Sequence, residues 1–387
     1  MKIVCAAALL LAACSSNPAP APDGGTDDAD EAGAPTSLSV DCRASASDLR
    51  CVPLASSKTH SVGKGPNGDG YRYGGGFVDS AQGRIVLGFA CPTCSDKDSG
   101  IMAIDLATGD RTLLSGTVND AVSGIAHVGA GDDFTNVGDV QLAPGGKWWV
   151  LDTESFGAAI DEVDPATGDR TPLYTQSDLD GETGICTSMG LGLNVGEQGA
   201  NAASGDGLAN LVVHPDGKIY LRASQPYDLM FQEIDLQAIV ELDQRACRVV
   251  STFNGKDPYG WLADDGTALV TNVGHDTLDS IDIASGTVTT ISSTGPTFGG
   301  ACNAIAPGDE TVLTTSGTDG PAWALVSIDR ASGDRTSLVA TAGPQTPDGT
   351  GAIVFVHPTL PGVYVMAGVG LITLFEPSTG NSAYLSR

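Results

Sequence analysis

A nine-residue motif recurs along this chain and constrains its fold more than any other feature. The motif IDLATGDRT spans Ile104–Thr112, with close copies at Val163–Thr171 and Ile328–Thr336 and weaker copies at Ile281–Gly286 and Phe375–Gly380. Apolar alternation precedes each copy and a β-prone run follows it, so each copy predicts a β-hairpin. The Asp can accept hydrogen bonds from N–H groups of the turn, and the Gly supplies the positive φ that the turn needs. We expect the Arg to pair across its own hairpin.

Two further predicted strands, joined by a turn of Pro, Gly and Asp, precede most of these hairpins. The first residues of the hairpin turns lie 39 to 79 residues apart, at Asp105, Asp164, Asp243, Asp282, Asp329 and Glu376. Four antiparallel strands in about 40–50 residues are typical of a β-propeller blade. The sequence therefore predicts an all-β fold, a β-propeller of four-stranded antiparallel blades. We count six blades from about Gly74.

A seventh blade is the alternative, because a short hairpin precedes the first full repeat. Cys42 and Cys51 flank this hairpin, and it lacks the strand pair that the later copies have. It is either a partial seventh blade or a cover for a sheet edge.

The composition agrees with a turn-rich β protein and excludes one class of partner. The chain has 51 Gly, and its acidic residues are 38 Asp and only 9 Glu. Asp favours turns whereas Glu favours helices. The formal charge of −28 leaves no basic stripe, so we expect no nucleic-acid partner. Solubility and surface repulsion are a sufficient reason for the negative charge.

The first residues have the pattern of an export signal. Residues 1–13 carry one basic residue, Lys2, and then an apolar run too short to cross a bilayer. The stretch Leu11-Ala12-Ala13-Cys14 resembles the bacterial lipobox, which implies that Cys14 is acylated with palmitate-type chains and becomes the first mature residue. An ordinary signal peptide with a chance Cys is the alternative. Ser15 resembles the outer-membrane sorting class, which implies an outer-membrane lipoprotein, periplasmic or on the cell surface.

A tether and one folded domain follow the signal. Residues 14–37 contain several Pro and acidic residues but no aromatic, Leu, Ile or Val. Such a segment cannot bury enough apolar area to offset its ordering entropy, so it predicts a disordered tether. Residues 38–387 then form the propeller domain, held to the lipid bilayer through Cys14.

Seven Cys remain in an exported, disulfide-permissive chain after Cys5 and Cys14 are set aside. We expect Cys42 to pair with Cys51. Cys91 and Cys94 form a CxxC, which is either a redox motif or a loop staple, and the absence of a βαβ pattern favours the staple. Cys186, Cys247 and Cys302 are an odd set, from which we expect one buried free thiol.

The repeat also carries a resemblance to known families. A turn such as Pro215–Lys218 before the hairpin motif resembles the NHL and SMP-30/gluconolactonase-like propeller repeats, over about Gly74 to Arg387. Such repeats occur in enzymes and in binding platforms. SMP-30-like lactonases hold one divalent metal on the propeller axis with Asp, Asn and Glu side chains.

A candidate metal site follows from this resemblance. Aligning the inner strands on the Pro that ends them gives equivalent channel-facing positions, which are Gly76, Asp139, Asn210, Tyr259, Cys302 and Ile353. Asp139 and Asn210, with Asn303 one residue out of register, suit a hard ion such as Ca²⁺. No Glu aligns, however, and Cys302 and Ile353 depart from the family's pattern. A water-filled polar channel is the alternative.

Two insertions, 117–136 and 177–207, break the repeat and are the loops in which we expect function. The second contains Asp178–Glu182, a possible Ca²⁺ loop without EF-hand spacing. Streptogramin-lyase-like propellers use His as a general acid–base, and this chain has five, which are His60, His127, His214, His275 and His357. His214 and His357 share one repeat position before Pro, which favours packing. Trp148 and Trp149 alternate faces of a strand and also favour packing.

Two functions follow. We favour a membrane-anchored, extracytoplasmic binding or scaffold lipoprotein that presents a propeller loop face to a protein, glycan or small-molecule ligand. The alternative is a metal-dependent SMP-30/lactonase-like hydrolase with Asp139 and Asn210 in an axial site. No nucleophile elbow, HExxH or P-loop is present.

Overall fold

A computed structural model describes the parts of the chain that build the sheets. The described residues are 41–44, 50–51, 62–66, 71–91, 98–120, 124–154, 157–179, 184–186, 210–224, 236–254, 262–272, 277–295, 305–307, 311–316, 324–338, 353–368 and 370–386. All of them belong to the second of two compact units, which spans Pro35–Arg387. Among these residues, no helix has the length and apolar character needed to cross a membrane.

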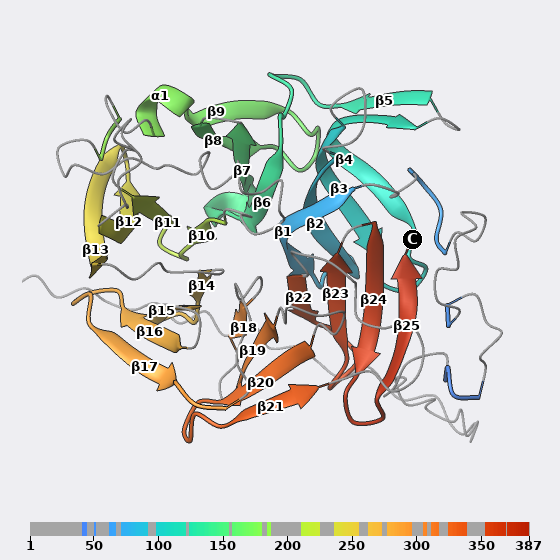
Figure 1. The fold of residues 1–387 in the computed structure, drawn as a ribbon. Helices are drawn as coiled ribbons and strands as arrows, with labels where there is room; N and C mark the ends of the chain where they lie inside the picture. The colour runs from blue at the N-terminus through green and yellow to red at the C-terminus, as the bar shows by residue number, and fades with distance from the viewer. Residues whose placement is uncertain are drawn as a thin grey trace, which may run out of the picture. The chain divides into compact units, whose positions relative to one another are not determined.

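These residues fold into six antiparallel sheets whose strands follow one another in chain order (Figure 1). Sheet 1 comprises β1 (Arg72–Asp79), β2 (Arg84–Ala90), β3 (Ser99–Asp105), β4 (Arg111–Asp120) and β5 (Gly124–Val128). Sheet 2 comprises β6 (Val137–Leu142), β7 (Trp148–Glu154), β8 (Gly157–Val163) and β9 (Arg170–Tyr174). Sheet 3 comprises β10 (Val212–Val213), β11 (Ile219–Ser224), β12 (Leu236–Asp243) and β13 (Ala246–Asn254).

The remaining sheets repeat the same four-stranded order. Sheet 4 comprises β14 (Ala263–Asp264), β15 (Ala268–Asn272), β16 (Leu278–Asp282) and β17 (Val288–Ser292). Sheet 5 comprises β18 (Ile305–Pro307), β19 (Thr311–Ser316), β20 (Ala324–Asp329) and β21 (Arg335–Leu338). Sheet 6 comprises β22 (Ile353–Val356), β23 (Tyr364–Gly368), β24 (Leu371–Glu376) and β25 (Asn381–Ser386). Two short helices, η1 (Pro144–Gly146) and α1 (Gln176–Leu179), lie in connections.

The first strands of the sheets contact one another in chain order, and β22 returns to contact β1. This arrangement is a β-propeller, as the sequence predicts. Five sheets have the four strands expected of a blade. Sheet 1 has a fifth strand, β5, which the sequence did not predict. It forms from the first part of the 117–136 insertion.

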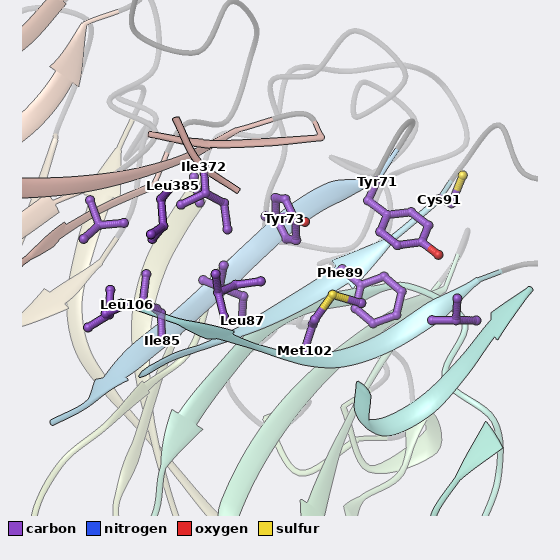
Figure 2. Packing of buried hydrophobic residues seen from close by; sticks show 14 residues of the cluster. Tyr71, Tyr73, Ile85, Leu87, Phe89, Cys91, Met102, Leu106, Ile372 and Leu385 are labelled. Atoms are coloured by element: carbon purple, nitrogen blue, oxygen red, sulfur yellow. The ribbon is translucent and has the colours of Figure 1, made fainter. Parts of the chain in front are cut away.

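Sheet 1 packs against sheet 6 through a cluster of buried side chains (Figure 2). Leu87 and Phe89 of β2 and Met102 of β3 lie on one side of this cluster, with Ile372 of β24 and Leu385 of β25 on the other. The residues of the two sides are almost 300 positions apart in the chain. Their burial against one another joins the first sheet to the last and so closes the ring, without an exchange of strands between the two sheets.

The predicted hairpin turn forms as expected. The backbone N–H groups of Ala107 and Thr108 donate to Asp105 Oδ1 over 2.9 and 2.7 Å. Gly109 has a φ of 74°. A Cβ on Gly109 would lie 1.8 Å from the carbonyl oxygen of Leu385, so only glycine fits where this turn meets sheet 6.

The prediction that the motif's Arg pairs across its own hairpin was wrong, because the Arg reaches the neighbouring sheet instead. Arg170 Nη1 donates to Ser115 Oγ of β4 over 3.0 Å, and that hydroxyl donates to the Gly168 carbonyl over 2.7 Å. We call this Arg–Ser–Gly arrangement a latch. Arg111, Ser386 and Gly109 form the same latch between sheets 1 and 6.

A third latch joins sheet 5 to sheet 4 through Arg335, Ser292 and Gly333. In each latch the Ser lies on the fourth strand of the preceding sheet. The hydroxyl both accepts from the guanidinium and donates to the carbonyl, so one side chain satisfies two buried groups. At these three joints the repeated motif therefore connects the hairpin to the blade before it.

The second half of the 117–136 insertion supports a latch. Ala130 N–H donates to Asp169 Oδ1 over 2.7 Å, and Arg170 Nε donates to the Asp132 carbonyl over 2.7 Å. Lys64 and Pro66 make the equivalent contacts to Asp110 and Arg111. Within the 117–136 insertion, in which we expect function, residues 130 and 132 thus repeat a structural contact that residues 64 and 66 also make.

The Cys42–Cys51 disulfide forms as predicted. Its segment contacts the hairpin of sheet 6: Cys42 N–H donates to Asn381 Oδ1 over 3.0 Å, and Tyr384 N–H donates to the Arg50 carbonyl over 2.8 Å. No strand forms among residues 41–44 and 50–51. Of the two alternatives, the described part of this segment is an edge cover.

Substituting Ser386 tests the latch that closes the ring. In Ser386→Ala, Arg111 Nη1 and the Gly109 carbonyl each lose a buried partner, so the free energy of unfolding should fall by about 1–3 kcal/mol. Urea denaturation measures this change. Ser337→Ala is the matched control, because Ser337 lies exposed on the fourth strand of sheet 5. An equal effect of the two substitutions would contradict the latch.

Candidate functional site

The predicted axial residues Asp139 and Asn210 lie at the start of two neighbouring inner strands. Asp139 is the third residue of β6, and Asn210 lies two residues before β10. β6 and β10 contact each other. Ile353 opens β22 and Gly76 lies within β1.

Asp139 is fully buried, and its carboxylate accepts only from protein groups. Oδ1 accepts from the backbone N–H of Val140 over 2.7 Å and from Gln141 Nε2 over 3.0 Å. Oδ2 accepts from the backbone N–H of Leu211 over 3.1 Å. The side chain therefore joins sheet 2 to the beginning of sheet 3.

Asn210 makes the equivalent connection from sheet 3 to sheet 4. Its Nδ2 donates to the Leu262 carbonyl over 2.6 Å, and its Oδ1 accepts from Leu262 N–H over 3.0 Å. Both side chains point toward the next strand, and neither lines an open channel, since their residues are 0% and 5% exposed.

The donor set does not assemble a metal site within the described residues. No group of three or more His, Cys, Asp or Glu side chains there has the spacing to hold a metal ion. The amide of Asn210 is bonded at both ends to Leu262. Asp139 alone offers a carboxylate, whereas Ca²⁺ takes six to eight oxygen ligands. Asn303, Tyr259 and Cys302 lie outside the described residues, so their predicted places are not tested.

Burial gives Asp139 unusual electrostatics. Desolvation raises the pKa of Asp139 to about 7, although the hydrogen bonds from Gln141, Leu211 and Val140 oppose this shift. A buried carboxylate that lacks a cation is costly to ionise. The charge of Asp139 therefore changes near neutral pH.

Sequence patterns did not identify a second carboxyl group whose pKa is raised. Burial, and next the nearby Asp152, raise the pKa of Asp161 on β8 to about 6. Asp152 accepts from the backbone N–H groups of Thr135 and Asn136. No motif marks Asp161, because its environment arises from the packing of sheet 2 and the segment that precedes it.

The histidines divide as predicted between packing and exposed positions. The Nδ1 of His357 accepts from the backbone N–H groups of Thr359 and Leu360, and burial lowers the pKa of this imidazole. His214 closes the equivalent turn in sheet 3, with its Nδ1 2.8 Å from Asp216 Oδ1. The packing role of both is confirmed. His127 lies exposed on β5, while His60 and His275 are outside the described residues.

The two tryptophans and Asp178 also have structural contacts. Trp148 is buried between sheets 1 and 2, and Trp149 Nε1 donates to Glu162 Oε2 over 3.2 Å. Asp178 accepts from Thr175 and from Arg245 Nη1. Its oxygens are thereby committed to α1 and to the hairpin of sheet 3. The rest of the Asp178–Glu182 candidate loop lies outside the described residues.

The remaining cysteines correct one expectation. Cys186 and Cys247 form a disulfide, whereas the sequence analysis expected one of them or Cys302 to be a free thiol. Cys91 is also disulfide-bonded, which fits the predicted staple. Cys94 and Cys302 lie outside the described residues.

The sequence matches no protein-family model and no curated protein. Solved structures similar to the chain include a gluconolactonase from Xanthomonas campestris, at 11% identity and a TM-score of 0.47, covering 83% of this chain and 88% of that one. An oligogalacturonate lyase in complex with manganese has 12% identity and a TM-score of 0.47, covering 86% of this chain and 82% of that one.

Regucalcin from Agrobacterium tumefaciens, a calcium-binding protein, has 12% identity and a TM-score of 0.44, with 83% of this chain and 94% of that one covered. These proteins are SMP-30/gluconolactonase-like or related propellers. At such identities a likeness concerns the fold alone, and activities differ among proteins that share a fold.

The charge on Asp139 predicts a pH dependence of stability. Its folded pKa of about 7 lies above the value near 3.9 of an unfolded Asp. The folded state therefore binds the extra proton, and stability falls as the pH rises from about 4 to 7, by up to about 1.4 kcal/mol per pH unit.

Urea denaturation at several pH values measures this slope. Asp139→Asn should flatten it, because the side chain no longer titrates. Asp161→Asn is the control, since it leaves Asp139 in place and should retain most of the slope near pH 7. An unchanged slope in Asp139→Asn would show that Asp139 is ionised in the folded protein.

Proposed function

We propose that this chain is an exported, lipid-anchored binding protein whose six sheets form a six-bladed platform for a partner, glycan or small ligand. Its disulfides carry the proposal. Cys42–Cys51 and Cys186–Cys247 are bonded, and Cys91 is bonded as well. Disulfides persist in oxidising compartments, which agrees with an export signal in residues 1–13.

The anchor in this proposal is the acylated Cys14, followed by the tether to residue 37. Two or three acyl chains hold a protein on a bilayer far more firmly than one does. We place the protein on the outer membrane, in the periplasm or at the cell surface, because Ser15 follows the lipobox.

The inner strands give the proposed platform a stable ring. The polar atoms of Asp139 and Asn210 are engaged with the backbone of the next sheet. In the described part of the chain, the axial positions thus stabilise the ring and offer no assembled set of reactive groups. A rigid ring of sheets is a suitable support for recognition loops.

Replacing the lipobox Cys tests the anchor. Cys14→Ser removes the acylation site, so the protein should move from the detergent-extracted membrane fraction to the soluble fraction. Fractionation and immunoblotting measure this. Cys5→Ser is the matched control and should leave the protein in the membrane fraction. Retention of Cys14→Ser in the membrane would refute the lipobox.

A second candidate function is metal-dependent hydrolysis of the lactonase type. One observation favours it: Asp139 is a fully buried carboxylate whose three partners are all uncharged N–H groups. A divalent cation would neutralise this charge. Bound there, such a metal would polarise a carbonyl group of a substrate. The sequence predicts Asp139, Asn210 and Asn303 as ligands of this metal; the amide of Asn210 is bonded to Leu262, and Asn303 lies outside the described residues.

Metal content separates the two functions. In the binding protein we expect substoichiometric Ca²⁺, Mn²⁺ and Zn²⁺ after dialysis, and a melting temperature that does not change in chelator. The hydrolase requires about one metal per chain, lost in Asp139→Ala and retained in the control Asp161→Ala. Elemental analysis of the purified chain measures the content, and that stoichiometric result would overturn the binding-only proposal.

A further inference from the structure

Each of the six hairpins has one equivalent residue position that faces the preceding sheet. The amino acid at this position differs from sheet to sheet. Strand register assigns this position to the residue that pairs with the apolar residue just before the Asp or Glu that opens the turn. The occupants in sheets 1 to 6 are Arg111, Arg170, Cys247, Val288, Arg335 and Ser382. Three are the latch arginines described above. Cys247 therefore stands in sheet 3 where a latch arginine stands elsewhere.

The facing position, on the fourth strand of the preceding sheet, also differs at the joint where Cys247 replaces the arginine. On the fourth strands of sheets 1, 4 and 6 it holds the latch serines, Ser115, Ser292 and Ser386. On the fourth strand of sheet 2, which faces the sheet 3 hairpin, register places Tyr174 there. The joint between sheets 2 and 3 thus has neither the arginine nor the serine of a latch.

A covalent bond replaces the latch at this joint. Cys247 of β13 is disulfide-bonded to Cys186, which lies in the segment that connects sheet 2 to sheet 3. Next to it, Arg245 Nη1 donates to Asp178 Oδ1 over 2.6 Å, although Arg245 is largely exposed. An exposed ion pair contributes little, so the disulfide is the strong connection on this side of the joint.

The disulfide is part of the apolar core of this joint, since Cys186 is a buried member of the core cluster and Cys247 packs against it. In the same cluster, Leu151 and Ile160 of sheet 2 pack with Leu211, Leu221 and Val240 of sheet 3. Reduction breaks only the S–S bond, so we expect these aliphatic contacts to remain. Its effect should therefore be confined to the outer part of the joint.

We infer that Cys186–Cys247 is a redox-sensitive clasp that takes the place of an Arg–Ser–Gly latch between sheets 2 and 3. The thiolate of a dithiol reductant attacks Cys247, which is only partly buried, and releases the Cys186 thiolate. The second thiol of the reductant then displaces Cys247 and forms the reductant's disulfide. Two electrons and two protons pass to the protein, which ends with two thiols.

Opening the clasp releases the described residues 184–186, which belong to the 177–207 insertion, from their covalent bond to sheet 3. The three latches consist of hydrogen bonds, which a dithiol does not cleave. The clasp thereby makes the joint between sheets 2 and 3 responsive to a reductant while the three latches stay in place.

Graded reduction of the full chain tests this inference. The folded protein is incubated with increasing dithiothreitol, its free thiols are alkylated, and mass spectrometry identifies each bond that opens. We expect Cys186–Cys247 to open at lower reductant than Cys42–Cys51, both of whose cysteines are buried. Opening of Cys42–Cys51 first would overturn the inference.

Amide hydrogen exchange on the same samples shows which segments the clasp protects from local opening. After reduction, exchange should become about tenfold faster in Arg170–Tyr174, 184–186 and Ala246–Asn254, as expected for local opening. Exchange in Val288–Ser292 and Arg335–Leu338, which a latch joins, should change less than about twofold. Unchanged exchange at the joint, or faster exchange in all sheets, would overturn a local clasp.

A variant provides an independent measurement without reductant. Cys186→Ala/Cys247→Ala should show the exchange pattern of the reduced wild-type protein and no further response to dithiothreitol at this joint. Cys42→Ala/Cys51→Ala is the matched control and should retain the wild-type response. A response at the joint in the first variant, or its loss in the control, would contradict the assignment to Cys186–Cys247.

Discussion

The contact on which the ring depends is the latch of a guanidinium, a serine hydroxyl and a glycine carbonyl between neighbouring sheets. A propeller blade buries its faces only against other blades, so the joints between sheets determine whether the ring holds. The latch sets three joints of the described sheets because the motif's Asp and Gly form the turn, the Gly backbone touches the preceding sheet, and the Arg bonds to it. Arg111 and Ser386 use this contact to join the two ends of the ring.

The sequence predicted the repeat, the strands and the propeller because the turn residues of the hairpin act locally. Asp105 and Gly109 need only their own turn to define a hairpin. The destination of Arg111 could not be predicted in this way, since its partner Ser386 is 275 residues away. The pairing of Cys186 with Cys247 was missed for the same reason, and strand β5 was hidden within an apparent insertion.

The contacts of the candidate site could not be predicted from the sequence. Alignment of the inner strands predicted equivalent places for Asp139 and Asn210, and each side chain bonds to the backbone at the beginning of the next sheet. Their side chains join successive strands, which no spacing of residues reveals, because the partners are the backbone groups of Leu211 and Leu262. Burial without a cation then gives Asp139 its raised pKa, a property of packing and not of a motif.

The coupling between a latch arginine and its serine tests this account most directly. A double-mutant cycle on Arg170→Ala and Ser115→Ala, measured by urea denaturation, gives that coupling. If the latch joins the sheets, the two substitutions are not additive, and the coupling is about 1 kcal/mol or more. Additive effects, with a coupling near zero, would contradict the claim that this contact holds neighbouring blades together.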